Sequence, residues 1–560
     1  MVQAGVDYDR AFNHLCHVLS LTQTGKPKAA LEGMILAVCD LEQGNVAGSG
    51  EIRTALEVYF GLRVKSRSLD DAIEELQAQG KLLRSGSTGR LWLSAAAQAE
   101  VRERTEAGDR LETAVRSQWL DGLRENGLAI AGQEQDLWRC LRLYMAQVFR
   151  QHGALSVELL TPSIGSKSLE LSSVEAALAS AMREHPCGDP TLTRKAIEMF
   201  FKEVTAERSR YVAQLLDGTF TFFALSIDEA AAQYITQTVP RLTLLLDTNF
   251  IFELLGLSHT ESTGDAAREL IEFIKRNNFP FQLYMHGETL AEVERTIGSI
   301  GRSALHGRTF TQELSRAAIS SRSMLGALSG VELAYHQLNA KRKVDTQTFL
   351  DKFKNVEPLL REHGIKVYRE AFNTPTVPDE EKALLVAEYK AYIEERGQTK
   401  PYDALDHDIT VWLSVQSKRR PARTPLHAGA LFLTVDYRFF NFDRQYLSAD
   451  THARGSQSVI VPKQLLQVLR PYGTQSDDFD ARFVECFGLA EVRTAHSDYG
   501  ASTSKMMSLL ATYEDVPHDI AVELLTDLVL RTELENLEGD PEQQVREKSR
   551  PPCFAGTRMR

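Results

Sequence analysis

The sequence has few of the features that mark secreted, zinc-binding or membrane-spanning proteins. Its six cysteines are widely scattered and include no Cys-x-x-Cys pair, which argues against a disulfide framework or a zinc ribbon. No apolar run reaches membrane-spanning length, because the longest, at 242–257, is interrupted by Asp247, Asn249 and Glu253. The first residues also lack the basic and apolar regions of a signal peptide. We therefore expect a cytoplasmic protein without a membrane partner.

Two further absences limit the functions to consider. The net charge is -12, so the chain lacks the overall basic character of a non-specific nucleic-acid coat protein, and any nucleic-acid site must be local. The chain also has no Gly-x-x-x-x-Gly-Lys-Ser/Thr phosphate loop. If the protein works with nucleotide hydrolysis, a partner must supply it.

The chain is long enough for three or four domains, because it has 560 residues and 43% of them are hydrophobic. Its patterns predict a multidomain protein of the α plus α/β class. We expect four regions: helices with a hairpin at 1–100, a helical domain at 101–240, an α/β domain at 241–472 with a helical insertion at about 298–400, and a helical extension at 473–560 that ends in a disordered tail.

The first region has three predicted helices, Leu31–Leu41, Glu51–Phe60 and one from Ser68 to Gly80, followed by a hairpin at 82–93. This order resembles a winged helix. The third helix exposes acidic side chains, which DNA phosphates would repel. We therefore expect this module to bind a protein partner or a second copy of the chain, in preference to DNA.

Most of the other helices are predicted from amphipathic periodicity. Each of these segments places apolar residues on one helical face. The predicted helices are 100–119, 133–151 and 193–216 in the second region, 344–363 and one from Pro378 to Gly397 in the insertion, and further helices between 477 and 537.

The residues around Asp247 predict the start of the α/β domain. The apolar run Leu242–Leu246 is typical of a strand buried on both faces, and a second apolar run after Asn249 predicts a helix. Asp247 therefore lies where a central parallel strand ends, which is where open α/β sheets bind their ligands. The aspartate either caps the helix or binds a cation.

Three later acids occupy comparable positions. Phe279–His286 predicts a second strand, which leads into a helix with Glu292 in its first turn. Asp408 directly precedes another apolar helical run. Asp436 follows the apolar strand that ends at Thr434. Each acid is thus expected at a strand end or a turn into a helix.

These four acids predict a metal site. The carboxyl ends of parallel strands share one edge of a sheet, so acids that are far apart in sequence can converge there. A cluster of oxygen ligands without nearby cysteine suits one or two Mg²⁺ or Mn²⁺ ions. Such an ion commonly serves phosphate chemistry.

The order of these motifs resembles the PIN-domain nucleases over about 241–298 and 400–472. The matching segments are the strand followed by Asp-Thr-Asn, then Thr-Leu-Ala-Glu-Val, Asp-Ile-x-x-Trp-Leu and Leu-Thr-Val-Asp. The resemblance implies an α/β/α sandwich with a central parallel sheet. It implies that the catalytic and metal-binding acids are Asp247, Glu292, Asp408 and Asp436. It also gives Asn249 and Thr434 supporting roles.

Some assignments within this scheme stay open. Asp406 is the reserve for the third acid, because it lies two residues before Asp408. For the neighbouring His407, capping or surface exposure is favoured over a contact with phosphate. Basic residues in the insertion are candidates for nucleic-acid binding, although they also fit an ordinary charged surface: Arg302, Arg308, Lys341, Arg342 and Lys343.

The resemblance implies hydrolysis of phosphodiester bonds by an endonuclease. The expected substrate is RNA, single-stranded or structured, with tRNA as one example. Large PIN-domain proteins with additional domains resemble toxins and antiviral effectors, which suggests such a role by analogy. The alternatives are a DNA nuclease docked by the winged-helix-like module, and a non-catalytic PIN-like scaffold in a larger assembly.

Overall fold

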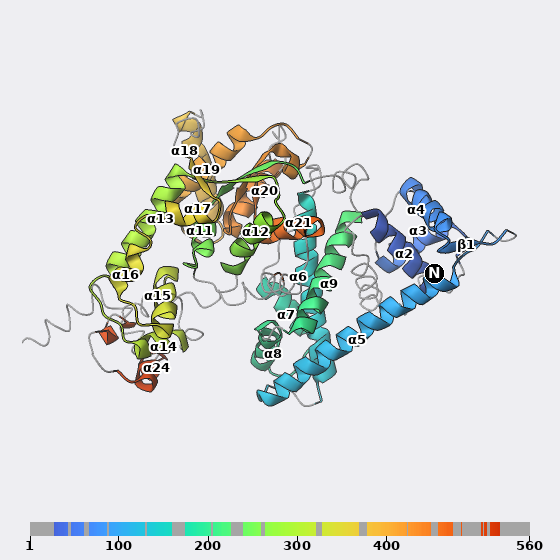
Figure 1. Ribbon diagram of the computed structural model, residues 1–560, viewed down its shortest axis with the longest axis horizontal. Helices are drawn as coiled ribbons and strands as arrows, with labels where there is room; N and C mark the ends of the chain where they lie inside the picture. The colour runs from blue at the N-terminus through green and yellow to red at the C-terminus, as the bar shows by residue number, and fades with distance from the viewer. Residues whose placement is uncertain are drawn as a thin grey trace, which may run out of the picture. The chain divides into compact units, whose positions relative to one another are not determined.

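The computed structural model describes most of the chain between residues 27 and 526. The described residues are 27–42, 46–60, 66–86, 89–128, 132–159, 174–202, 205–225, 239–258, 264–320, 328–368, 378–422, 424–449, 457–473, 483, 506–507, 509–511 and 516–526. Helices predominate among them, together with one five-stranded parallel sheet (Figure 1). The predicted combination of α and α/β architecture is confirmed at this level.

The chain divides into two compact units, and each is discontinuous in sequence. The first unit comprises 1–245, 268–283 and 374–489, and the second comprises 246–267, 284–373 and 490–560. The division passes through two strands, β3 (Leu242–Leu246) and β4 (Phe281–His286).

The N-terminal part of the first unit contains the predicted helices and hairpin. The elements are α2 (Pro27–Leu41), α3 (Ser49–Phe60), α4 (Ser66–Ala78), β1 (Leu82–Arg84) and β2 (Leu91–Leu93), and the two strands are antiparallel. In α4, Leu69, Ile73 and Leu76 lie on the buried face, as their helical spacing requires. Asp70 and Glu74 are exposed. The prediction of an acidic outer face on this helix is confirmed.

The next part of the first unit is helical, as predicted. Its helices are α5 (Ala95–Glu125), α6 (Glu134–Glu158), α7 (Val174–Glu184), α8 (Pro190–Lys202) and α9 (Ala206–Leu225). The prediction of one helix at 193–216 is wrong, because α8 ends at Lys202 and α9 begins at Ala206. The Thr205 hydroxyl accepts a hydrogen bond from the Arg208 amide at 3.2 Å, which is the geometry of a helix N-cap. The apolar periodicity of the sequence continues across Thr205, so it does not indicate the break between the two helices.

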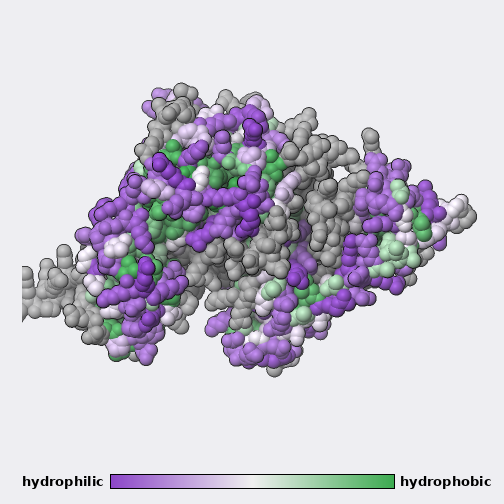
Figure 2. All heavy atoms as spheres, viewed as in Figure 1, coloured by the Kyte–Doolittle hydropathy of each residue, from purple (hydrophilic) through white to green (hydrophobic). Residues whose placement is uncertain are grey.

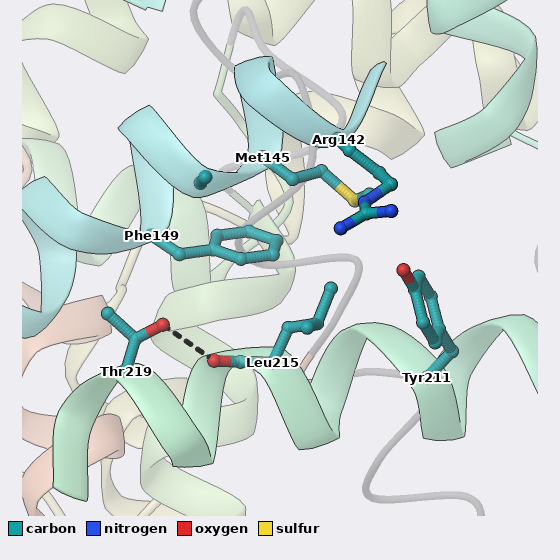
Figure 3. A pocket seen from close by; sticks show the side chains of 7 residues that line it. Arg142, Met145, Phe149, Tyr211, Leu215 and Thr219 are labelled. Atoms are coloured by element: carbon teal, nitrogen blue, oxygen red, sulfur yellow. Dashed lines mark hydrogen bonds between the residues drawn. The ribbon is translucent and has the colours of Figure 1, made fainter. Parts of the chain in front are cut away.

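A small cavity lies between α6 and α9 (Figure 3). Its volume is about 10 Å³, which is room for about one water molecule. Met145, Phe149 and Leu215 contribute apolar lining, and the Thr219 hydroxyl donates to the Leu215 carbonyl at 2.7 Å. This cavity is too small to be a ligand site.

The strands of the sheet follow the order β5-β4-β3-β6-β7. β5 (Lys366–Tyr368) pairs with β4, and β6 (Ala430–Leu433) pairs with β7 (Val459–Ile460), both in parallel register. The central strands are buried, and α19 (Tyr402–Lys418) and α20 (Tyr437–Ala449) pack around β6 with residues such as Trp412 and Phe439. α21 (Pro462–Leu469) follows β7. The strands predicted around Asp247, His286 and Asp436 are confirmed.

The helices that continue from the sheet into the second unit are α11 (Thr248–Leu254), which follows β3, and α13 (Gly287–Ile300), which follows β4 and leads into the π-helical turn η1 (Gly301–Leu305). α12 (Gly264–Arg276) precedes β4. The part of α12 from Arg268 onward belongs to the first unit. α18 (Asp379–Glu394) precedes α19 and matches the predicted helix after Pro378. The short turns η4 (Pro425–Ala428) and η5 (Arg470–Tyr472) complete the described elements of this part.

The insertion contains α14 (Gln312–Ser320), α15 (Gly330–Lys341), α16 (Thr346–Asp351) and α17 (Glu357–Glu362). The prediction of one helix over 344–363 is wrong. Asp345 caps α16 through the Thr348 amide at 2.8 Å, and Pro358 lies in the first turn of α17, the part of a helix that accepts proline. These two signals define separate helices. The strand β5, which has three residues, was not predicted.

The C-terminal extension is described only in part. α24 (His518–Thr526) lies within the predicted helical region. The remainder of 477–537 that is not described, and the predicted disordered tail at 538–560, lie outside the described residues.

None of the described helices combines the length and the apolar character needed to cross a lipid bilayer. The longest, α5, has 31 residues and carries charged residues along its length. Hydrophilic residues also cover much of the coloured surface seen in Figure 2.

The insertion contains a buried histidine, His336, which makes the stability of the fold depend on pH. The His336 ring is buried, and its Nδ1 lies 3.0 Å from the Ser315 hydroxyl, which accepts a hydrogen bond from the Asn339 amide at 2.9 Å. Ser315 can therefore donate to a neutral His336. Burial lowers the pKa of His336 to about 3.

We expect acid to destabilise the fold through His336. Below about pH 6.5 the unfolded chain binds a proton that the folded histidine does not, so the free energy of unfolding falls by about 1.4 kcal/mol per pH unit until the pH approaches the folded pKa. Urea unfolding at neutral and mildly acidic pH should show a smaller pH dependence for His336→Gln than for the wild type. His306→Gln, at an exposed position, should keep the wild-type dependence. Equal pH dependence in all three proteins would contradict this account.

Candidate functional site

Asp247 directly follows β3 and caps α11. Its Oδ1 accepts a hydrogen bond from the Thr248 amide at 2.7 Å, and its Oδ2 lies 3.5 Å from Asn249 Nδ2. The aspartate is buried, whereas Asn249 is exposed. Asp247 is therefore a helix cap, as one of the two predictions had it. Its second oxygen points to the predicted supporting residue.

Glu292 lies one turn farther along α13 than predicted. The helix begins at Gly287 because His286 caps it, accepting from the Glu288 amide at 3.2 Å, so Glu292 is in the second turn and not the first. The carboxylate of Glu292 accepts a short hydrogen bond from the Thr248 hydroxyl. Thr248 thus donates its backbone N–H to Asp247 and its hydroxyl to Glu292, and so connects these two predicted acids.

Asp408 lies within α19, and not in a turn before the helix as predicted. Pro401 caps this helix, so the chain is already helical from Tyr402. Leu405, Asp408 and Trp412 follow the helical spacing of the buried face. The reserve candidate Asp406 points elsewhere and forms an ion pair with Lys382 at 2.8 Å, with 37% of its side chain exposed.

Asp436 lies three residues after the end of β6. Its amide donates to the Thr434 hydroxyl at 2.9 Å, which gives Thr434 a contact that fits the predicted supporting role. Arg438 contacts both carboxylate oxygens, at 2.9 Å from Nε and 3.1 Å from a terminal nitrogen. This bidentate pair orients a carboxylate that is almost fully buried.

A lysine that the sequence analysis did not select connects Asp408 to Asp436. Lys400 Nζ donates a short hydrogen bond to Asp408 Oδ2 and lies 3.2 Å from Asp436 Oδ2. Burial favours the neutral form of Asp436, but the charges of Lys400 and Arg438 outweigh this effect and hold its pKa at about 2. Burial also opposes the charge on Lys400, yet Asp408 and Asp436 raise the pKa of the lysine. Asp436 and Lys400 are therefore charged near neutral pH.

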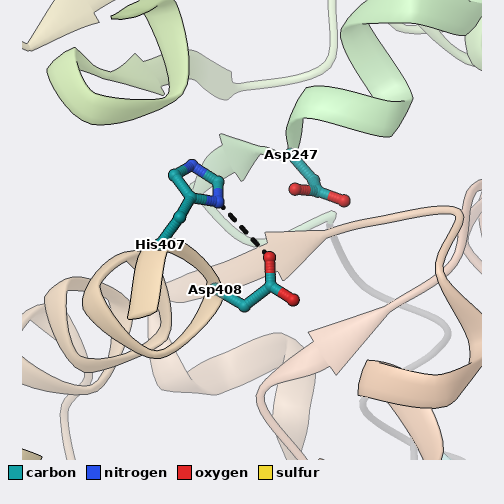
Figure 4. Close-up of side chains that lie close together, drawn as sticks. All are labelled: Asp247, His407 and Asp408. Atoms are coloured by element: carbon teal, nitrogen blue, oxygen red, sulfur yellow. Dashed lines mark hydrogen bonds and ion pairs between the residues drawn. The ribbon is translucent and has the colours of Figure 1, made fainter. Parts of the chain in front are cut away.

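The acids that follow β3 and β6 belong to neighbouring strands of the sheet. Asp247, His407 and Asp408 are all buried and each offers one ligand atom, and these three atoms lie within 4.8 Å of one another (Figure 4). His407 Nδ1 is 3.3 Å from Asp408 Oδ1. The prediction that His407 has a surface or capping role is wrong. Its side chain is buried, and the residue lies within α19, beyond the N-cap Pro401.

The donor set fits a hard divalent cation. Carboxylate oxygens from Asp247 and Asp408 supply the ligands that Mg²⁺ and Mn²⁺ prefer, and an imidazole nitrogen is acceptable to Mn²⁺. Two further predicted acids are each linked to this group by one residue that contacts both. Asp436 shares Lys400 with Asp408, and Glu292 shares Thr248 with Asp247. We refer to Asp247, Glu292, His407, Asp408 and Asp436 as the acidic cluster.

Asp443 shows how a buried acid of purely structural function differs from these. Its two oxygens accept from the Trp412 indole at 2.8 Å, from the Ser458 hydroxyl and amide, and from the Val459 amide at 3.0 Å. These neutral donors attach the start of β7 to α19 and α20. By contrast, Asp408 and Asp436 are held by the charged groups of Lys400 and Arg438.

The basic candidates in the insertion differ in their surroundings. Four of them have exposed side chains: Arg302, Lys341, Arg342 and Lys343. Arg308 instead donates to the Ser303 and Ala304 carbonyls at 2.8 and 2.6 Å, so its guanidinium closes the end of η1. This contact gives Arg308 a structural role and leaves the other four as the available cations of the predicted set.

Comparison of the chain with known protein families, curated proteins and solved structures gives no match.

Proposed function

We propose that the chain is a metal-dependent endonuclease that hydrolyses phosphodiester bonds, with RNA as its substrate, and that its α/β part is a PIN-like domain. The observation that carries this proposal is the acidic cluster. Buried carboxylates follow adjacent parallel strands, and the Lys400 ammonium contacts both Asp408 and Asp436. Burying several acidic groups is costly unless they are paired or bind a metal, and clusters of this kind are frequent at catalytic sites.

Within this proposal, Asp247 and Asp408 hold Mg²⁺ or Mn²⁺, with Asp436 and Glu292 completing the set for one or two ions. An ion bound there would offset the negative charge of the phosphate oxygens and would lower the pKa of its bound water. Thr248 and Asn249 orient Asp247, while Thr434 and Arg438 orient Asp436. Hydrolysis adds water to phosphorus and breaks its bond to the 3′-oxygen, which leaves a 5′-phosphate and a 3′-hydroxyl.

Several chain residues can contact a nucleic-acid backbone. Arg438 combines its hold on Asp436 with a side chain that is 41% exposed, so it can also approach a phosphate. Arg302 and the run Lys341–Lys343 add exposed positive charge from η1 and the end of α15. This local charge supports nucleic-acid binding by a protein whose net charge is -12. The acidic outer face of α4 weighs against docking of duplex DNA through the N-terminal module.

The alternative of a non-catalytic scaffold is less well supported. A scaffold needs only the sheet and its apolar core, whereas here the carboxyl groups of Asp247 and Asp408 are buried beside a histidine. Replacing buried ionic groups by apolar residues is often neutral or stabilising. Acidic groups that are kept where strands end therefore favour a chemical function over a scaffold.

The proposal is tested by incubating the purified chain with single-stranded RNA, tRNA, single-stranded DNA and duplex DNA, each with Mn²⁺ or with EDTA. We expect the RNAs to be cut with 5′-phosphate ends in Mn²⁺ and to remain intact in EDTA. Cleavage of DNA alone would transfer the activity to a DNA nuclease. Failure to cut any of the four substrates would favour the scaffold, and cleavage that persists in EDTA would exclude the metal-dependent mechanism.

A further inference from the structure

The lysine between Asp408 and Asp436 occupies a position that a metal ion would also use. Lys400 lies outside the helices, after the end of α18 and directly before Pro401, the cap of α19. Its ammonium contacts one oxygen of each aspartate. The exposed fractions are 12% for the Lys400 side chain, 9% for Asp408 and 5% for Asp436.

The two aspartates that contact Lys400 already have cationic partners, and Asp247 adds a further carboxyl group beside Asp408. The two aspartates are matched by two cations, Lys400 and Arg438. Tyr389 closes the apolar side, with its ring centre 5.6 Å from Lys400 Nζ, and its buried hydroxyl has no hydrogen-bond partner among the described residues. A divalent ion bound to Asp408 or Asp436 would add two positive charges close to the Lys400 ammonium. Like charges repel strongly at such a buried site.

Lys400 is better able to leave than Arg438. Carboxylate ligands approach Mg²⁺ or Mn²⁺ to about 2.0–2.2 Å, closer than they approach an ammonium, so an oxygen cannot serve both cations in the same direction. Arg438 contacts Asp436 through two guanidinium nitrogens and donates a third hydrogen bond to it from its backbone amide. Lys400 is held only by its ammonium, at the end of a flexible four-carbon side chain.

We infer that Lys400 is a built-in competitor of the divalent ion, and that a phosphodiester arriving at the site draws its ammonium away from Asp408 and Asp436. Lys400 thereby couples metal binding to nucleic-acid binding: each strengthens the other, and Asp408 and Asp436 stay paired with Lys400 when no nucleic acid is present. This inference rests on the proposed function, because it requires the acidic cluster to bind metal. It assigns Lys400 a regulatory role in loading that site.

The test measures Mn²⁺ binding to the full chain by calorimetry, without RNA and with a short single-stranded RNA that has phosphorothioate linkages, which are charged and resist hydrolysis. Lys400→Met and Lys400→Gln remove the charge, and the second keeps a hydrogen-bond donor in case the first does not fold. Lys382→Met is the matched control, because it breaks a lysine–aspartate pair at Asp406 outside the cluster.

Without RNA, both Lys400 variants should bind Mn²⁺ about tenfold more tightly than the wild type or more, since a neighbouring like charge is removed. The RNA should tighten Mn²⁺ binding in the wild type and in Lys382→Met, but not in the Lys400 variants. If the folded Lys400 variants bind Mn²⁺ no more tightly than the wild type, the inference is overturned while the proposed function stands. If no protein binds Mn²⁺, the proposed function falls and the inference falls with it.

Discussion

Asp408→Asn is expected to lower the rate constant for RNA cleavage roughly a thousandfold, by analogy with single catalytic groups in other hydrolases. The amide keeps the size of the side chain but removes the negative charge that faces Lys400, His407 and the proposed ion. Lys400 retains Asp436 as a partner, so the fold should survive. Single-turnover cleavage in Mn²⁺ measures the loss directly, with circular dichroism as the check on folding.

The neighbouring aspartate provides a close control for this prediction. Asp406 is two residues away on the same helix, and its ion pair with Lys382 is partly exposed. Asp406→Asn should cleave RNA within about threefold of the wild type, because an exposed ion pair contributes little. If Asp406→Asn is inactive and Asp408→Asn is active, the third acid has been assigned to the wrong residue.

Asp443→Ala is expected to destabilise the first unit by about 3–5 kcal/mol. The substitution removes the acceptor of four hydrogen bonds, so the buried Ser458 and Val459 amides lose the acceptor that Asp443 provides, whereas the Trp412 indole keeps only the Ser458 hydroxyl. The effect should appear in urea unfolding as a lower midpoint for the transition of this unit.

Asp403→Ala is the control for stability. Asp403 is exposed in the first turn of α19, so its loss should cost less than about 1 kcal/mol. Near-equal midpoints for the two variants would show that the hydrogen bonds of Asp443 do not hold β7 in place. A large loss of activity without a loss of stability in Asp443→Ala would place this residue in the chemistry instead.

The strand ends were predictable because their signal is local. An apolar run followed by an aspartate identifies the end of a buried strand, and both Asp247 and Asp436 lie where that pattern predicts. Thr434 belongs to the same pattern. The sheet order followed from the sequence only as an expectation of neighbouring parallel strands, because pairing between distant segments has no local marker.

Helix boundaries were less accurate where capping residues interrupt a continuous periodic pattern. Thr205 and Pro358 each lie at the start of a new helix inside a segment that was predicted as one helix. The start of α19 at Pro401 had the same effect on the candidate site, since it moved Asp408 from a turn into the helix. A proline or capping residue should therefore have outweighed periodicity at these positions.

Lys400 and His407 were missed for a different reason. Their importance depends on which side chains face them, and Lys400 meets an acid 36 residues away. A lysine before proline is unremarkable in sequence. Two signals were nevertheless present. His407 stands between a reserve acid and a predicted ligand, and three aspartates in six positions require a compensating cation nearby.

The central claim is that acids from distant parts of the chain act as one site, and a double-mutant cycle in RNA cleavage tests it most directly. Asp247→Asn, Asp408→Asn and the double variant are compared with the wild type under single-turnover conditions in Mn²⁺. If both acids serve one ion, removing the second adds little, and the double variant should cleave within about threefold of the slower single variant. Losses that multiply, or a single variant that keeps the wild-type rate, would contradict a shared site.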